Sequence, residues 1–217
     1  MSSINAAKLF RVTATLAFFG IISLFLSGCA SVPPVIKIGL VGPFEGRYRD
    51  VGYDVIYSAR LAVREENSRD DIGDYRVALV ALDDFGDPES AEEVARSLVL
   101  DPNVVAVVGH WLPHTTEAAI AIYEAAGVPF VPTGVSPFTE TNPDLLPADF
   151  KSEYSQVTPF DEVAGPYAGA GYDSISLILK AISMADEQHR SIDRSTIGDI
   201  LTTLDHEGVT GEVNLPQ

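Results

Sequence analysis

The feature that most constrains the fold of this chain is a regular alternation between short apolar runs and amphipathic stretches. The apolar runs are rich in β-branched residues, as strands are, and lie at residues 35–41, 76–82, 104–108 and 128–131. Between them, apolar residues recur with a helical period at residues 54–67, 89–100 and 116–126. A chain that alternates strands with helices in this way is predicted to adopt an α/β fold.

The character of the predicted strands indicates how they pack. They are apolar along most of their length instead of alternating apolar with polar residues, which is typical of strands covered on both faces. Right-handed crossover helices between parallel strands provide that cover. We therefore expect a doubly wound, mainly parallel sheet between two helix layers. Asp87 and Pro88 suit the start of one helix, and Gly127 suits the end of another.

The amino-terminal segment indicates export. Lys8 and Arg11 precede an apolar run at residues 12–26, a pattern typical of a secretory signal and short for a membrane-spanning helix. The run ends in Leu-Ser-Gly-Cys at residues 26–29, which resembles the bacterial lipobox. This resemblance implies a lipoprotein signal peptide at residues 1–28, a lipidated Cys29 that anchors the exported chain to the membrane, and a tether at residues 29–35. A plain signal anchor or an ordinary buried cysteine is the alternative.

Cysteine content and charge exclude several classes of function. Cys29 is the only cysteine, so an intramolecular disulfide and sites built from several thiols are excluded. Without Lys8 and Arg11, residues 29–217 carry 12 basic against 31 acidic residues, a formal charge of −19. Such a chain repels nucleic acid. The acidic surface favours solubility and does not identify a ligand.

The pattern changes after the fourth predicted strand. Residues 139–149 contain Pro143 and Pro147 without periodicity, which is typical of a connecting loop or hinge. Helices are predicted again at residues 164–185 and 196–204, followed by a strand within residues 208–215. We therefore divide the body into residues 36–141, a loop at residues 142–148, and residues 149–217.

Several separate motifs carry a resemblance to a known family. They are a first strand with the glycines that follow it, an acid-rich turn, three further glycine-containing segments and two late segments. Their residues are 38–43 with Gly46 and Gly52, 83–88, 107–110, 127–129, 133–136, 172–173 and 208–211. Together they resemble the type I periplasmic solute-binding proteins of branched-chain amino-acid ABC transporters. The resemblance extends over nearly all of the exported part.

The resemblance implies a fold and a function. Members of this family have two lobes that close over a ligand, and their chain crosses to the second lobe and returns. Residues 36–141 resemble the outward half of the first lobe and residues 149–217 its returning half, so most of the second lobe is expected to be missing between them. The implied function is capture of an amino acid or similar small acid for a membrane permease, without enzymatic activity or a cofactor. The alternative is an interaction or scaffold protein that kept the lobe but not ligand capture.

Ligands of open α/β sheets bind at the carboxyl ends of the strands. The resemblance implies that the loop at residues 109–116 offers backbone amides and the hydroxyls of Thr115 and Thr116 to a carboxylate, although helix capping would use the same hydroxyls. Pro113 departs from the family pattern, since it has neither a hydroxyl nor an amide hydrogen. The resemblance also implies a second ligand loop with Gly134, Val135 and Ser136, for which an ordinary turn is the alternative.

Three further residues, Tyr48, Arg49 and Trp111, are expected to form an aromatic and cationic wall at the mouth of the site, or to pack on a neighbouring molecule. His114, in the same loop as Trp111, is also expected to be a ligand-binding residue.

The four-residue spacing of His110 and His114 raises the possibility of a metal site, which Pro113 disfavours because it prevents a regular helix across the pair. Asp83 and Asp84 resemble the acidic pocket of response-regulator receivers, but the export signal argues against that function. Enzyme motifs such as a Ser-His-Asp order or a phosphate-binding glycine loop are not evident. Binding is therefore the predicted task.

Overall fold

The computed structural model describes residues 33–69, 72–189, 191–213 and 215. It separates residues 1–33 from a compact unit, Pro34–Gln217, and only this second unit is described below. The predicted signal peptide and lipidated Cys29 lie outside the described residues. Within the described ranges, no helix has the length and apolar character needed to cross a membrane.

A four-stranded parallel sheet forms the centre of the unit. Its strands are β1 (Val35–Gly42), β2 (Arg76–Asp83), β3 (Val104–Gly109) and β4 (Phe130–Pro132), in the spatial order β2-β1-β3-β4. The central strand β3 is buried along its whole length, whereas the edge strand β2 is mostly half-buried. The predicted parallel α/β sheet is therefore confirmed.

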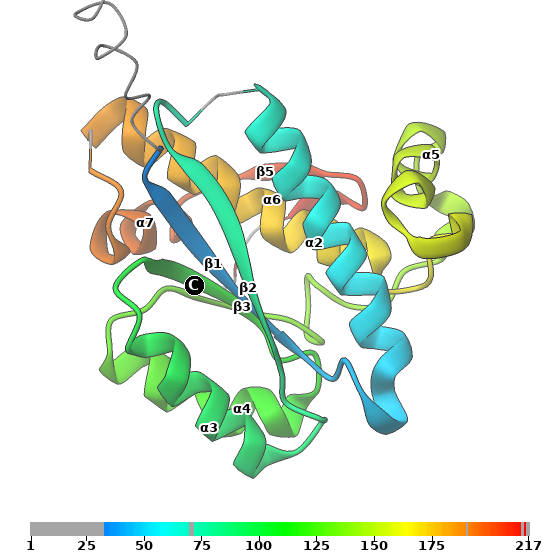
Figure 1. The fold of residues 1–217 in the computed structure, drawn as a ribbon, viewed down its shortest axis with the longest axis horizontal. Coiled ribbons are helices and arrows are strands. Elements are labelled where there is room, and N and C mark those ends of the chain that lie inside the picture. Colours follow the sequence, from blue (N-terminus) through cyan, green and yellow to red (C-terminus); the bar gives the residue numbers. More distant parts are fainter. Residues whose placement is uncertain (1–32, 70–71, 190, 214, 216–217) are drawn as a thin grey trace, which may run out of the picture. The chain divides into compact units, whose positions relative to one another are not determined.

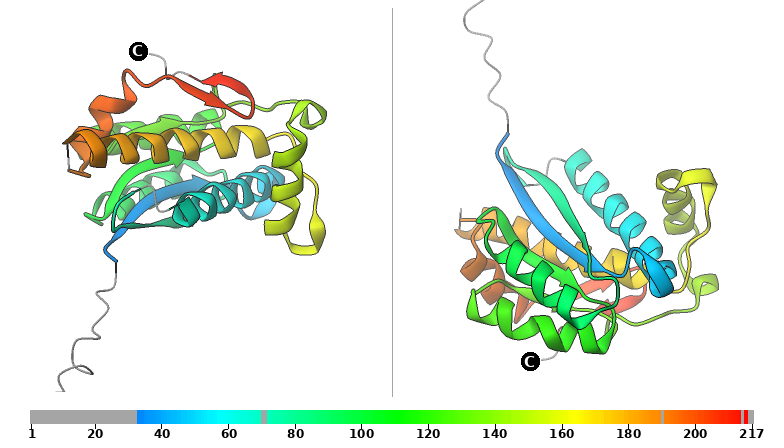
Figure 2. Two further views of the ribbon diagram at one scale, coloured as in Figure 1. Left: turned by 90° about the horizontal axis from the view of Figure 1, so that it is seen from above. Right: turned by 60° about the horizontal axis from the view of Figure 1, so that its bottom comes forward.

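Helices cover both faces of the sheet. Figure 1 shows α3 (Pro88–Val99) and α4 (Pro113–Ala125) on one side, and α2 (Arg49–Arg69) and α6 (Ala168–Met184) on the other. Helix α7 (Arg194–Leu201) joins the α6 layer, and α5 (Ala148–Val157) packs beside α2. The two further views in Figure 2 show the same layering. This arrangement is the doubly wound architecture expected from the sequence.

Local signals explain where the helices begin. Asp87 accepts a hydrogen bond from Ser90 N at 2.9 Å and caps α3, and Asp193 accepts one from Thr196 N at 3.0 Å and caps α7. Helix α4 begins at Pro113, three residues before the predicted start at residue 116. Proline is well suited to this first position because a helix's first turn needs no amide hydrogen there. Pro113, which was predicted to prevent a regular helix across His110 and His114, is thus the first residue of α4.

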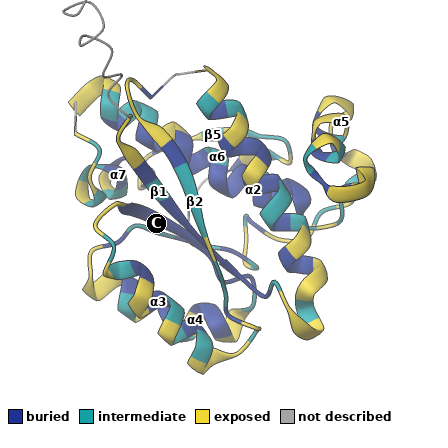
Figure 3. Cartoon of the chain, viewed as in Figure 1, coloured by how far each residue is buried: buried dark blue, intermediate teal, exposed yellow. Residues whose placement is uncertain are grey.

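The main hydrophobic core draws on both halves of the chain. It packs Ile38 and Leu40 of β1 and Val108 of β3 with Ile178 and Ile182 of α6. Figure 3 shows these strands and the inner side of α6 as buried. A second core, which includes Val107 and Tyr123, lies between the sheet and the α3–α4 layer. Residues before and after the mid-chain prolines therefore share one apolar interior.

The segment predicted as a loop at residues 142–148 is partly helical. A 3-10 turn spans Pro143–Leu145, and α5 starts at Ala148. Phe150 and Tyr154 of α5 pack with Leu61 of α2 and Ala168 in a third apolar cluster. The segment thus folds onto α2. That it marks the position of a missing second lobe stays a prediction.

The carboxyl-terminal strand predicted within residues 208–215 is an antiparallel hairpin of β5 (His206–Gly208) and β6 (Gly211–Val213), separate from the main sheet. The buried carboxylate of Asp173 on α6 accepts hydrogen bonds from Val209 N at 2.7 Å and Thr210 N at 2.9 Å. These bonds join the hairpin turn to α6.

Asp54 gives the unit a pH dependence. Its carboxylate accepts a hydrogen bond from Tyr167 N at 3.0 Å, and burial raises the pKa of this group from 3.8 to about 6. A folded-state pKa above the unfolded value means that the folded chain binds more protons between these two limits. The free energy of unfolding should therefore fall as pH rises from about 4 to about 6. Urea unfolding across this range should show a weaker fall in Asp54→Asn, with the exposed Asp74→Asn as control. An unchanged slope in Asp54→Asn would contradict the assignment.

Candidate functional site

The carboxyl ends of the strands lie along one edge of the sheet. The register pairs Gly42 with Asp83 and Gly109 with Pro132 at these ends. The loops that follow the four strands therefore emerge at the same edge, where parallel α/β proteins bind their ligands. We call this region the carboxyl edge.

The first turn of α4 lies at the carboxyl edge. The first intrahelical bond of this helix runs from Thr116 N to Leu112 O at 3.0 Å, and Leu112, the N-cap residue, makes no side-chain cap bond. The amides of His114 and Thr115 come before that bond and have no acceptor within the helix. Because Pro113 has no amide hydrogen, these two N–H groups form the positive end of the helix.

The two threonine hydroxyls act within the loop. Thr115 is buried and its hydroxyl donates to Leu112 O at 3.0 Å, while the hydroxyl of Thr116 accepts from His110 N at 3.3 Å. Neither hydroxyl accepts a hydrogen bond from an amide of the first turn of α4, so neither acts as the helix cap that was the alternative. The hydroxyls stabilise the turn, and the backbone amides are left as the donors that this turn offers.

Trp111 connects the loops that follow three strands. It packs closely against two glycines: a Cβ atom added to Gly42 would lie 3.0 Å from the Trp111 ring, and one added to Gly134 would lie 2.2 Å from the Trp111 carbonyl oxygen. It also meets Tyr167 edge-on, with ring centroids 6.2 Å apart. The side chain is only 2% exposed, so Trp111 does not form the exposed wall that the sequence suggested. It belongs to the packing beneath the edge.

Tyr48 and His114 meet near Gly86 in the loop after β2. A Cβ at Gly86 would lie 2.8 Å from the Tyr48 ring, and His114 Nε2 lies 3.0 Å from Gly86 O. Tyr48 is half-buried and His114 exposed. Arg49 is exposed, and its Nε lies 3.9 Å from Asp50 Oδ1. The structure therefore brings Tyr48 and His114 together and leaves Arg49 outside this cluster.

The loop after β4 is the other exposed part of the carboxyl edge. Gly134 has φ +76°, and its amide donates to Phe138 O at 2.8 Å, which closes a tight turn. Within that turn Val135 and Ser136 are exposed to solvent. The close approach of Gly134 to the Trp111 carbonyl places this turn against the loop that leads into α4.

A buried polar chain lies beneath the same loops. His110 Nδ1 is 3.0 Å from Asp84 Oδ2, and His110 Nε2 is 3.1 Å from the Tyr123 hydroxyl. All three side chains have no exposed surface. Burial raises the pKa of Tyr123, with the nearby Asp84 carboxylate as the smaller cause, so the phenol stays protonated. The sequence did not reveal this arrangement.

The two alternatives based on titratable residues find no support in this geometry. His110 is buried and hydrogen-bonded to side chains, whereas the exposed His114 contacts Gly86 O. Among the residues that the structure describes, no cluster of three metal-ligating side chains exists. Asp83 Oδ1 accepts from Phe44 N at 3.0 Å and Phe85 N at 2.8 Å, which is the role of a turn residue.

Sequence reasoning also missed polar groups at this edge. Thr133 comes directly before Gly134, and its hydroxyl is buried without a hydrogen-bond partner among the described residues, as is Trp111 Nε1. The sequence singled out Trp111 as an exposed residue and Thr133 as part of a family motif, and it did not indicate that these polar atoms are buried. The burial of the Thr133 hydroxyl and of Trp111 Nε1 depends on the folded structure, which places the two loops side by side.

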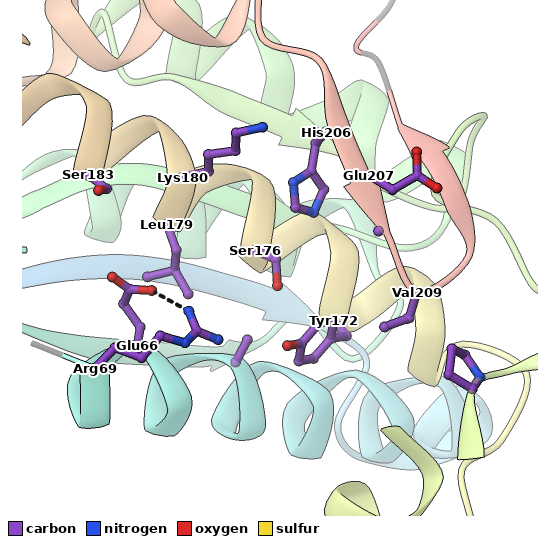
Figure 4. Close-up of a pocket in the computed structure, with 13 residues that line it drawn as sticks. Glu66, Arg69, Tyr172, Ser176, Leu179, Lys180, Ser183, His206, Glu207 and Val209 are labelled. Atoms are coloured by element: carbon purple, nitrogen blue, oxygen red, sulfur yellow. Dashed lines mark hydrogen bonds and ion pairs between the residues drawn. The ribbon is translucent and has the colours of Figure 1, made fainter. Parts of the chain in front are cut away.

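A cavity of about 520 Å³ lies elsewhere, between α2, α6 and β5. Its lining includes Arg69, Ser176 and His206, and Figure 4 shows the His206 ring directed toward α6. Arg69 Nη1 forms an ion pair with Glu66 Oε2 at 3.1 Å, so its charge is already matched. This cavity is lined by none of the site residues expected from the sequence.

Comparison with known proteins identifies the family. A model of the family described as periplasmic binding protein matches residues 35–149 of this chain. The chain belongs to this family. The matched residues include all four strands of the sheet and the first turn of α4, so the carboxyl edge is part of the family's common structure.

Two curated relatives agree with this assignment. The chain is 30% identical over 150 residues to an amino acid binding protein of Pseudomonas aeruginosa, and 30% identical over 149 residues to the leucine-specific-binding protein of Salmonella typhimurium. Each match covers 69% of this chain but 38% of the relative. The chain thus spans well under half the length of these relatives.

Solved structures show the same fold. The branched-chain amino acid transporter substrate binding protein LivJ of Streptococcus pneumoniae, in complex with isoleucine, is 16% identical with a TM-score of 0.64, and the match covers 84% of this chain and 92% of that one. A substrate-binding protein of Desulfitobacterium hafniense in complex with Leu gives 15% identity, a TM-score of 0.67 and coverages of 84% and 93%. At these identities the likeness establishes the fold.

Proposed function

We propose that this chain is a lipid-anchored, extracytoplasmic solute-binding protein that captures an amino acid or similar small acid for an ABC permease. The observation that carries the proposal is the uncapped first turn of α4 at the carboxyl edge, beside the exposed turn at Gly134–Ser136. Backbone amides at the positive end of a helix bind anions, and a carboxylate suits them in size and charge. The anchor at Cys29 and the permease follow from the lipobox and the family.

The donors in this proposal are mainly backbone groups. The amides of His114 and Thr115 bind the carboxylate, and the exposed hydroxyl of Ser136 adds a donor from the neighbouring loop. Tyr48 and His114 border this position at Gly86. Recognition through amides needs no hydroxyl at residue 113, so the proline there is compatible with carboxylate binding.

A second function, as an interaction or scaffold protein, is favoured by one observation. His114, Val135 and Ser136 at the carboxyl edge are exposed, and a ligand held at an open edge keeps a large part of its surface in water. Such a protein would keep the fold and not bind the amino acid. Titration separates the two functions.

The test is isothermal titration calorimetry of the full chain, purified in mild detergent, with leucine, isoleucine and valine. Leucine should bind, and leucinamide, which lacks the carboxylate, should bind at least about tenfold more weakly because it loses charge-assisted hydrogen bonds. Equal affinity for leucine and leucinamide would contradict carboxylate recognition by α4. No heat with any amino acid at high protein concentration would favour the scaffold function.

A further inference from the structure

The buried chain of Asp84, His110 and Tyr123 has no part in the proposed contacts, yet it joins the elements that form them. Asp84 follows β2, His110 follows β3, and Tyr123 lies on α4. The three side chains have no exposed surface, and polar groups so deeply buried are costly unless each finds a partner. The arrangement therefore calls for a role.

The distances fit one arrangement in which every polar group of the buried chain has a partner. The Tyr123 hydroxyl is protonated and can donate to His110 Nε2 across 3.1 Å, and His110 Nδ1–H can then donate to Asp84 Oδ2 across 3.0 Å. The other carboxylate oxygen, Asp84 Oδ1, accepts from Gly86 N at 2.9 Å. Both oxygens of the buried carboxylate are thus satisfied, and the imidazole has one consistent tautomer.

Aromatic packing holds the same residues from the side. Tyr123 stacks on Phe130 with ring centroids 4.7 Å apart, and His110 meets Phe130 edge-on at 6.0 Å. The ring of His110 contacts Tyr123 near the end of α4, and its backbone amide donates to the Thr116 hydroxyl in the first turn of the same helix. Between them Trp111 has φ +73°, a conformation that non-glycine residues adopt only when their surroundings impose it.

We propose that His110 is a positioning residue for the ligand turn: its imidazole donates from Nδ1 to Asp84 and accepts at Nε2 from Tyr123, and thereby sets the direction of the first turn of α4. This inference rests on the proposed function for its effect on ligand affinity. Its structural content, the tautomer and the anchoring of residues 111–116, can be tested without a ligand.

The matched variants are Tyr123→Phe and Tyr154→Phe in the full chain. Each removes one hydroxyl from a buried tyrosine, but Tyr154 lies on α5 in the cluster beside α2. A loss of general stability should be similar in both. Only Tyr123→Phe should weaken leucine binding, by about tenfold, because it leaves buried His110 Nε2 without its partner. Asp84→Asn should weaken binding to a similar degree.

Two readouts keep the inference separate from the proposed function. Nitrogen-15 spectra of the imidazole should show the His110 proton on Nδ1, and amide hydrogen exchange at residues 111–116 should be at least about tenfold faster in Tyr123→Phe than in Tyr154→Phe. If the wild-type chain binds no amino acid, the proposed function fails and these two readouts decide the inference. A proton on Nε2, or equal exchange and equal affinity in the two variants, would overturn it.

Discussion

Replacing Gly134 by alanine is expected to destabilise the folded chain by about 3 kcal/mol and to remove leucine binding. The residue has φ +76°, where an L-residue with a Cβ is disfavoured. In addition, the new Cβ would lie 2.2 Å from Trp111 O and 2.6 Å from Trp111 C. Both atoms are backbone, so one of the two loops beside α4 must move.

Gly127→Ala is the matched control for this prediction. Gly127 has φ +60° at the end of α4, but a Cβ there would meet no atom within 4 Å. This variant should lose only about 1 kcal/mol, the cost of the left-handed conformation, and should keep its affinity for leucine. Urea unfolding and calorimetry measure both quantities. Equal losses in the two variants would show that the contact between Trp111 and Gly134 carries no energy.

Asp173→Ala is expected to be similarly damaging, with a loss of about 2 to 4 kcal/mol in the free energy of unfolding. The buried carboxylate is the acceptor for Val209 N and Thr210 N, and its removal leaves both amides without it. Gly208 lies so close that a Cβ would be 2.3 Å from the Asp173 carboxyl carbon. The hairpin of β5 and β6 should therefore detach, and its amides should exchange quickly with solvent.

Asp87→Ala provides the comparison for Asp173. Asp87 is exposed and accepts a hydrogen bond from Ser90 N as the cap of α3. Its loss should cost about 1 kcal/mol, the usual value for a helix cap. If both variants lose the same stability, or if the amides of residues 206–213 keep their protection in Asp173→Ala, the hairpin is held by other contacts.

The strands and helices were predictable where a periodic pattern decides the structure. The predicted strand at residues 76–82 is β2 with one further residue, because residues 77–82 form an unbroken apolar run. The prediction was poorer for β4, which begins at Phe130 instead of residue 128. Val128 N donates to Tyr123 O at 3.0 Å and so still belongs to the end of α4. A local pattern does not reveal such a bond.

The candidate site was predictable only as a set of loops. The sequence placed residues 109–116 and 134–136 after strands, and parallel topology then brings them to one edge. It did not show that Trp111 is buried, since burial depends on packing against Gly42, Gly134 and Tyr167 from three other segments. Likewise, the bond between Asp84 and His110 joins residues 26 positions apart. Only the folded structure brings such partners together.

The central claim is that the carboxylate of an amino acid binds at the first turn of α4. The most direct measurement is calorimetry of leucine and leucinamide on the full chain carrying Ser176→Trp, which fills the separate cavity between α2 and α6. Binding at α4 predicts that leucine keeps its wild-type affinity and that leucinamide stays at least about tenfold weaker. Loss of leucine binding in this variant would place the ligand in the α2–α6 cavity and contradict the claim.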